Sequence, residues 1–300
     1  MDVLLTGANG FLGRSITSKL STGNNLLLGL SRTSGDYKID LEKEIPKFKQ
    51  RFDLVIHAAG KAHSVPKTAE DKKQFHDINV TGTLNLLQAL ENSAIPKQFV
   101  FISSVSVYGL ESGININEEH ALGAKDAYGV SKIEAEKMVT EWCRRHNTIC
   151  TILRLPLLVG KKPPGNLGSM IKAIDKGYYF NIDGGKAKKS MVLVEDVASF
   201  IPKVASVGGF YNLTDGVHPD FNALSIAISN QRKKKVPLSL PLFITKFIGY
   251  AGDMLGDKAP VNSSKIKKIT SDLTFDDSKA RRIVGWNPQS VLEYLKTNSL

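Results

Sequence analysis

The stretch D2-V-L-L-T-G-A-N-G-F-L-G13 decides how this chain folds. Its apolar first part predicts a short buried strand, and the apolar pattern that continues to Leu20 predicts a helix. Between them, Gly7 permits a tight turn, Gly10 lets the backbone approach a pyrophosphate, and Gly13 lets the helix pack closely on the strand. The free N–H groups and the positive end of the helix dipole would then face phosphates. The stretch therefore predicts a dinucleotide-binding strand, turn and helix.

Further apolar runs continue the same alternation of strands and helices along the chain. The predicted strands are 25–30, 37–41, 52–57, 98–103, 148–154 and 210–213, with helices from residue 79, over 126–146 and from 194. The strand 98–103 is apolar without alternation, which is typical of a strand buried on both faces. The expected fold is α/β, with a doubly wound parallel sheet.

Tyr128 and Lys132 are four residues apart in the predicted helix, so both side chains are expected on one face. A nearby ammonium favours the phenolate and is expected to lower the pKa of Tyr128 toward working pH. Ser104, at the end of an upstream strand, would hold an alcohol or carbonyl oxygen beside the phenol. These three are the candidate catalytic residues for moving a hydride and a proton on and off a secondary alcohol.

In this order, the glycine turn, the strand ending in serine and the Tyr-x-x-x-Lys helix resemble the extended short-chain dehydrogenase/reductase family. These are the NAD-dependent epimerase/dehydratase-like enzymes, which act largely on nucleotide-activated sugars. The matching segments are G-x-x-G-x-x-G at 7–13, N-V-x-G-T at 79–83, S-S-x-x-V-Y-G at 103–109, R-x-P-x-x-x-G at 154–160 and V-x-D-V-A at 194–198. The resemblance implies a Rossmann-like sheet and a smaller C-terminal α+β substrate lobe.

The resemblance also implies which residues contact the cofactor and the substrate. The expected cofactor-binding residues are Gly7, Asn9, Gly10, Phe11, Leu12, Gly13, Ser31, Arg32, Asp40, Leu41, His57, Ala58, Ala59, Gly60, Asn79, Tyr128, Lys132 and Pro156. The expected substrate-binding residues are Ser104, Ser106, Tyr128, Asn166 and Lys189. His57 is expected to contact the cofactor through its backbone and to take no part in acid–base chemistry. Asn79 is expected to form a structural hydrogen bond. For Asp40 and Leu41, adenine contact and a helix N-cap are equal alternatives.

The residues that leave the second strand bear on the choice of cofactor. An acidic residue at this place binds ribose hydroxyls, whereas Ser31 and Arg32 suit a 2′-phosphate. The sequence therefore favours NADP(H) over NAD(H).

The composition changes after Gly160, where a Lys- and Pro-rich loop begins. We expect a dinucleotide-binding domain over 1–160, to which 191–215 return, and a substrate lobe formed by 161–190 and 216–300. Residues 178–182 and 189–194 predict a hairpin, on which Lys189 takes the place of a family arginine that neutralises a substrate phosphate.

The formal net charge of +11 is compatible with nucleic acid, an anionic membrane or a phosphate-bearing substrate. The Lys and Arg residues are scattered apart from dense runs at 186–189 and 232–235, so most of the charge is interpreted as solvated surface and no nucleic-acid partner is expected. The apolar segment 236–255 contains Pro and charged residues, and no membrane insertion is expected. Two cysteines without paired spacing suggest no metal site. No signal peptide is visible, which favours a cytoplasmic protein.

By resemblance, the expected reaction is hydride transfer at C4 of a nucleotide diphosphate sugar, in polysaccharide precursor synthesis. A 4-ketoreductase is slightly favoured because of Arg32, and a UDP-glucose 4-epimerase-like enzyme is the alternative. A dehydratase is disfavoured, since Ser104-Val105-Ser106 replaces the family's Thr-Asp-Glu. A non-catalytic NAD(P) sensor and an enzyme for steroid-like or flavonoid-like alcohols are further alternatives. Pairing into homodimers through helices 126–146 and 78–92 is left open.

Overall fold

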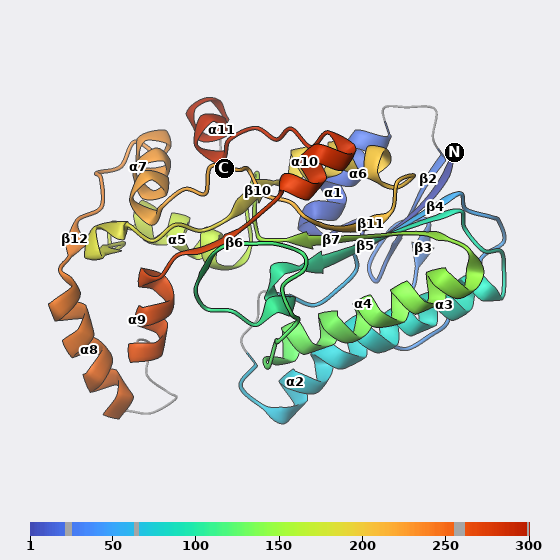
Figure 1. Ribbon diagram of the computed structural model, residues 1–300, viewed down its shortest axis with the longest axis horizontal. Helices are drawn as coiled ribbons and strands as arrows, with labels where there is room; N and C mark the ends of the chain where they lie inside the picture. The colour runs from blue at the N-terminus through green and yellow to red at the C-terminus, as the bar shows by residue number, and fades with distance from the viewer. Residues whose placement is uncertain (22–25, 63–65, 255–261, 299) are drawn as a thin grey trace.

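The computed structural model describes residues 1–21, 26–62, 66–254, 262–298 and 300. Seven parallel strands form the central sheet, in the order β11-β7-β5-β4-β1-β2-β3 (Figure 1). They are β1 (Asp2–Thr6), β2 (Leu26–Ser31), β3 (Tyr37–Lys38), β4 (Leu54–His57), β5 (Gln98–Ser104), β7 (Ile149–Leu155) and β11 (Gly209–Asn212). The strand order reverses between β1 and β4, which is where such sheets bind ligands. The predicted doubly wound parallel sheet is confirmed.

Helices cover both faces of the sheet (Figure 1). On one face α1 (Phe11–Leu20) packs against α6 (Val194–Val204), with α10 (Ser278–Val284) beside them. On the other face lie α2 (Ala69–His76), α3 (Gly82–Glu91) and α4 (Ala127–His146). Each layer buries a separate hydrophobic cluster, with Ile16 and Ile201 in the first and Leu86 and Trp142 in the second. The two clusters hold the sheet between them and so fix its carboxyl edge.

Short strand pairs and helices extend the molecule beyond that edge. The pairs are β6 (Gly113–Ile116) with β13 (Leu273–Phe275), β8 (Leu157–Val159) with β10 (Met191–Leu193), and β9 (Asn181–Ile182) with β12 (Ser239–Leu240). The helices are α5 (Gly165–Asp175), α7 (Phe221–Gln231), α8 (Leu242–Met254), α9 (Ser263–Thr270) and α11 (Val291–Thr297). A third cluster, which includes Leu167, Leu224 and Val291, joins α5, α7 and α11.

The predicted hairpin of 178–182 with 189–194 is wrong. β9 pairs in parallel with β12, and β10 pairs in parallel with β8. The intervening Asp183–Gly185 forms a 3-10 turn. Asn181 is held instead by distant partners, because its N–H donates to the Leu238 carbonyl and its side chain donates to Ser225. Long-range contacts of this kind override the local turn signal.

Several predicted boundaries also differ, and β3 ends at Lys38 rather than at residue 41. Residue 25, the start of the expected second strand, lies outside the described residues, and β2 begins at Leu26. The helix expected from Asn79 begins earlier, at Ala69, and passes through a π-helical turn, Asp77–Thr81, into α3. Thr68 and Asp71 form a capping box at that earlier start.

Candidate active site

The glycine turn after β1 forms a cradle at the N-terminus of α1. A Cβ atom at Gly13 would lie 2.1 Å from the Gly7 carbonyl oxygen, so only glycine lets the helix approach the turn this closely. Gly10 begins the helix and supplies no side-chain hydrogen bond to it. The first N–H groups of α1 therefore remain available to an anion, and the cradle fits the pyrophosphate of a dinucleotide.

Asn9 ties this cradle to the turn that follows β2. Its amide nitrogen donates to the Ser31 hydroxyl at 2.7 Å and to the Ser34 hydroxyl at 2.8 Å. Ser31 is buried, whereas Arg32 beside it is exposed and has no polar partner among the described residues. The guanidinium of Arg32, which is predicted to bind a 2′-phosphate, is therefore accessible to such a group.

His57 ends β4 as a buried structural residue. Its ring nitrogens lie 2.6 Å from the Thr6 hydroxyl and 2.9 Å from the Thr83 hydroxyl. Burial, together with the nearby Lys132 charge, lowers the pKa of His57 to about 3. The Thr6 hydroxyl also accepts the Ala59 N–H at 3.1 Å. These bonds place the 57–60 turn beside the cradle and keep the imidazole neutral at ordinary pH.

Asn79 lies in the π-helical turn, a feature often found at functional sites. Its side-chain oxygen accepts the Lys61 N–H at 2.7 Å, and its nitrogen donates to the Ser131 hydroxyl at 2.9 Å. A Cβ atom at Gly60 would lie 3.0 Å from the Asn79 oxygen and 3.3 Å from the Lys132 nitrogen. Asn79 thus joins the 57–60 turn to the helix that carries Lys132.

The first turn of α4 packs against the segment that follows Ser104. Asp126 caps the helix by accepting the Gly129 N–H at 3.0 Å. A Cβ atom at Gly129 would lie 2.8 Å from the Ser106 carbonyl oxygen. Glycine at this position therefore brings Tyr128 next to the end of β5.

Ser104 and Tyr128 lie on neighbouring elements of the site. The Ser104 hydroxyl accepts the Ser106 N–H at 3.2 Å, donates to the Ser106 hydroxyl at 3.1 Å, and is near enough to Tyr128 to affect the pKa of its phenol. Burial raises the pKa of Tyr128, the bond to Ser104 opposes that rise, and the Asp126 carboxylate adds to it. The ring of Phe75 lies 5.9 Å from the Tyr128 ring.

Lys132 follows Tyr128 by four residues in α4 and is almost fully buried. Its ammonium donates to the Ile102 carbonyl oxygen at 2.9 Å and lies 4.6 Å from the centre of the Phe101 ring. Burial lowers the pKa of Lys132 to about 8, although the Glu136 carboxylate opposes this. The expected lowering of the Tyr128 pKa by Lys132 is wrong in this structure, because burial of the phenol dominates.

A buried ion pair behind the site was missed in the sequence. The Glu136 carboxylate accepts two hydrogen bonds from Arg154, at 2.8 and 3.1 Å, and one from Ser103 at 2.5 Å. Arg154 also donates to the Tyr108 hydroxyl at 3.1 Å. The available signal was the spacing, since Glu136 follows Lys132 by four residues and so shares its helix face.

Other predicted cofactor contacts occupy the rim of the same edge. Leu41 is buried against α3, and its carbonyl accepts a hydrogen bond from Asn85 at 2.7 Å. Asp40 is partly buried and lies 3.2 Å from the Lys43 ammonium. Pro156 separates β7 from β8. Residues 41–43 form a turn and no helix, so the helix N-cap alternative for Asp40 and Leu41 is wrong, whereas the cofactor contacts stay predictions.

Two of the predicted substrate residues, Asn166 and Lys189, lie on elements separate from those of Ser104 and Tyr128. Asn166 is exposed in the first turn of α5. The Lys189 ammonium donates to the carbonyl oxygens of Lys268, at 3.0 Å, and Ser271, at 2.8 Å, and burial lowers its pKa. Lys189 thus joins the Lys186–Ser190 segment to the end of α9, and its contact with a phosphate stays a prediction.

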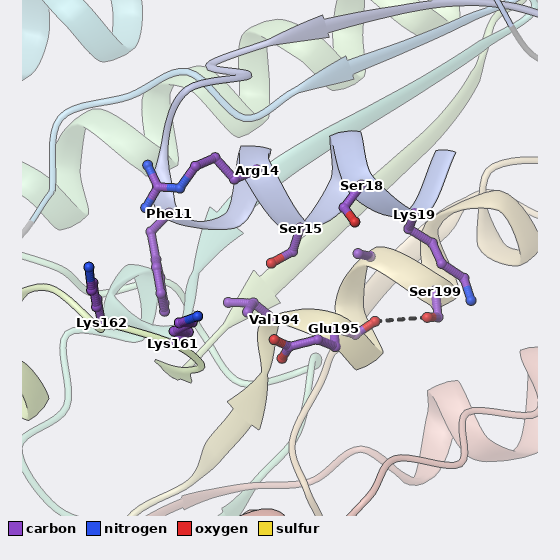
Figure 2. A pocket seen from close by; sticks show the side chains of 11 residues that line it. Phe11, Arg14, Ser15, Ser18, Lys19, Lys161, Lys162, Val194, Glu195 and Ser199 are labelled. Carbon is purple, nitrogen blue, oxygen red and sulfur yellow. Dashed lines mark hydrogen bonds between the residues drawn. The ribbon is translucent and has the colours of Figure 1, made fainter. Parts of the chain in front are cut away.

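A hollow of about 710 Å³ lies between α1 and α6 (Figure 2). Phe11 extends from the start of α1 toward Lys161 and Lys162, and Glu195 faces it from α6 (Figure 2). Ser104, Tyr128 and Lys132 do not line this hollow. It is therefore distinct from the site of Ser104 and Tyr128.

Comparisons with known proteins agree with this geometry. The family model for the NAD dependent epimerase/dehydratase family matches residues 3–212. N-acetyl-alpha-D-glucosaminyl-diphospho-ditrans,octacis-undecaprenol 4-epimerase of Escherichia coli O157:H7 is 30% identical over 93% of this chain and 88% of its own. GDP-6-deoxy-D-mannose reductase of Pseudomonas aeruginosa is 34% identical over 47% of this chain and 46% of its own.

A solved structure shows the same fold over nearly the whole chain. The crystal structure of UDP-glucose 4-epimerase from Thermotoga maritima with UDP-glucose matches at a TM-score of 0.76 and 22% identity, covering 99% of this chain and 96% of that one. The predicted resemblance is confirmed. This chain belongs to the NAD-dependent epimerase/dehydratase family.

Proposed function

We propose that this chain inverts the configuration at C4 of a sugar carried on a diphosphate, using NAD(H) or NADP(H). The proposal is supported by the position of Ser104 at the carboxyl end of β5 and by the packing of the start of α4, which carries Tyr128 and Lys132, against the segment that follows Ser104. The glycine cradle after β1 lies at the same edge of the sheet. A phenol, a serine hydroxyl and a buried ammonium form a proton-transfer device beside a dinucleotide site.

The side chains divide the reaction between them. The bound dinucleotide would supply redox chemistry by accepting the C4 hydride and returning it. Tyr128 takes the proton of the C4 hydroxyl as the C4–H bond breaks, and gives it back when the hydride returns to the opposite face of the ketone. Ser104 holds the C4 oxygen throughout. Lys132 keeps a positive charge behind the phenol, and no net oxidation results.

We prefer epimerisation to net reduction because 4-epimerases match a larger share of this chain than the reductase does. Two of the relatives that match nearly the whole chain are 4-epimerases, whereas the match to the reductase covers less than half of it. A 4-ketoreductase remains the second candidate because exposed Arg32 favours NADPH, the cofactor of net reduction.

The diphosphate is the part of the substrate that the two kinds of relative share. The name of one relative specifies a diphospho-undecaprenol sugar, and the Thermotoga structure holds UDP-glucose. Asn166 and Lys189 are the proposed contacts for this diphosphate. The carrier is accordingly either a nucleoside or a polyprenol.

Product analysis tests the proposal. Purified protein would be incubated with UDP-glucose, UDP-N-acetylglucosamine or a polyprenyl diphosphate N-acetylglucosamine, each with NAD⁺ or NADP⁺, and the C4 epimer measured by NMR. Epimer formed without net cofactor reduction supports the proposal. Stoichiometric oxidation of NADPH with a 4-keto sugar, and no epimer from any substrate, would establish the reductase instead.

The variant Tyr128→Phe tests the proposed proton donor. It removes the hydroxyl and should lower kcat by roughly 10²–10⁴-fold while cofactor binding persists. Unchanged turnover would contradict the assigned role.

A further inference from the structure

Helix α8 directs its aromatic residues away from the protein. Phe243, Phe247 and Tyr250 follow one another at the i, i+4, i+7 spacing of one helix face, and they are 73%, 75% and 65% exposed. Thr245 and Gly249, on the opposite face, are buried. Surface helices normally turn their apolar face to the core, whereas α8 turns its aromatic face to the solvent.

Packing against α9 fixes this orientation. A Cβ atom at Gly249 would lie 2.7 Å from the Ile266 side chain and 3.2 Å from the Ser263 nitrogen. The Asp253 carboxylate accepts the Ser263 N–H at 3.1 Å. Only a face of small side chains fits against α9, so the helix cannot rotate to bury its aromatic residues.

The surface lies at one end of the molecule. α8 forms the end of the long axis away from the N-terminus, with α9 between it and the rest of the chain (Figure 1). The carboxyl ends of β5 and β7 point toward the same end (Figure 1). Leu238, just before α8, is a further apolar residue that is 72% exposed.

Positive charge is concentrated in the segment of the chain that contains α8. Residues 232–270 contain nine of the 40 Lys and Arg of the chain but two of its 29 Asp and Glu. The exposed lysines of this segment that the structure describes are Lys233, Lys234, Lys235, Lys246, Lys265, Lys267 and Lys268. The net charge of the chain is thus centred on one segment rather than spread evenly.

We infer that α8 and these lysines form a docking surface for an anionic phospholipid bilayer. An amphipathic helix with exposed Phe and Tyr, flanked in the sequence by lysine-rich segments, is suited to lie in the plane of the lipid headgroups. Its rings would enter the acyl boundary, while lysine ammonium groups extend to lipid phosphates. No helix of the described residues is long and apolar enough to cross a bilayer, so the contact is peripheral.

Charge favours a bilayer over a second copy of this chain. Two copies that met through this face would place like charges against one another, whereas an anionic bilayer compensates them. Docking would turn the carboxyl edge of the sheet toward the membrane, where a polyprenol-linked substrate would reside. The inference rests on the surface alone, and its test measures binding without catalysis, so it can fail while the proposed function holds.

Vesicle sedimentation of the full chain tests this surface. We expect the protein to sediment with vesicles of equimolar phosphatidylcholine and phosphatidylglycerol at low salt, and not with phosphatidylcholine alone. The double variant Phe243→Ser/Phe247→Ser should lower the partition coefficient roughly tenfold or more. Ile114→Ser is the matched control, because Ile114 is 71% exposed on β6 and should leave binding unchanged.

A second measurement locates the helix in the lipid. Phe247→Trp should show fluorescence quenched by lipids brominated on their acyl chains, and Ile114→Trp should not. The inference is overturned if the wild type ignores anionic vesicles, or if the double variant binds them as well as the wild type. It is also overturned if gel filtration shows a wild-type dimer that the double variant dissociates, without any vesicle binding.

Discussion

Arg154 and Glu136 form a bidentate ion pair. The Arg154 side chain is 5% exposed and the Glu136 side chain is 3% exposed. The pair joins β7 to α4, and Ser103 adds β5 through its own hydrogen bond to Glu136. Ser103 precedes Ser104, and Glu136 is one turn from Lys132. The pair therefore connects the strand and the helix that carry the candidate catalytic residues.

Glu136→Ala should lower the free energy of unfolding by about 3–5 kcal/mol, because it leaves the Arg154 guanidinium buried without a counter-charge. Urea denaturation would measure this. Glu141→Gln, which breaks an exposed pair with Arg144 on the same helix, should have little effect. Glu136→Leu/Arg154→Met should recover part of the lost stability. Equal losses in the single and double variants would contradict an ion-pair origin.

The buried ammonium of Lys132 should make stability depend on alkaline pH. Its pKa is about 8 in the folded chain and 10.5 ordinarily, so the unfolded chain binds more protons between these values. The contribution of Lys132 to the free energy of unfolding should therefore rise as the pH increases from 8 to 10.5. The unfolding free energy of the wild type, relative to Lys132→Met, should increase by up to about 3 kcal/mol between pH 8 and 10.5. A difference that stays flat with pH would show that Lys132 titrates normally.

His57 should make the chain sensitive to acid. Its pKa is about 3 when folded against 6.5 ordinarily, so its contribution is fully present above pH 6.5 and falls as the pH drops toward 3. Between pH 6.5 and 4.5 the wild type should lose about 2 kcal/mol more than His57→Gln, as measured by urea titration at each pH. Parallel loss in both proteins would exclude His57 as the cause.

Local pattern was sufficient to predict the sheet and the helix that carries both Tyr128 and Lys132. The apolar strand before Gly7 and the four-residue spacing of Tyr128 and Lys132 are properties of neighbouring residues, and the structure keeps both. Where the contacts are long-range, prediction failed. Asn181 pairs with a segment more than fifty residues away, and the pKa of Tyr128 depends on burial that its neighbours in sequence do not reveal.

The orientation of α8 also could not be predicted from the sequence. Its residues read as an interrupted apolar segment, and their pattern alone does not say which face is buried. The close contact of Gly249 with Ile266 of α9 decides that, and it sets Phe247 outward.

Arg32 should determine the choice between the two nicotinamide cofactors. It is exposed next to buried Ser31, and Asn9 holds that turn beside the glycine cradle. A guanidinium there would form charge-assisted hydrogen bonds with a 2′-phosphate, and NAD lacks that group. Arg32→Ala should therefore weaken NADP⁺ binding by roughly 10–100-fold, as measured by calorimetric titration, and leave NAD⁺ binding nearly unchanged.

Arg51→Ala removes another exposed arginine and serves as the control for a general loss of positive charge. If Arg32→Ala weakens both cofactors equally, the arginine contributes only long-range attraction. If it weakens neither, the 2′-position lies elsewhere, and the argument for net reduction by NADPH loses its support. A selective loss of NADP⁺ binding would keep the reductase as a candidate, because discrimination for the 2′-phosphorylated cofactor would then be built into the turn after β2.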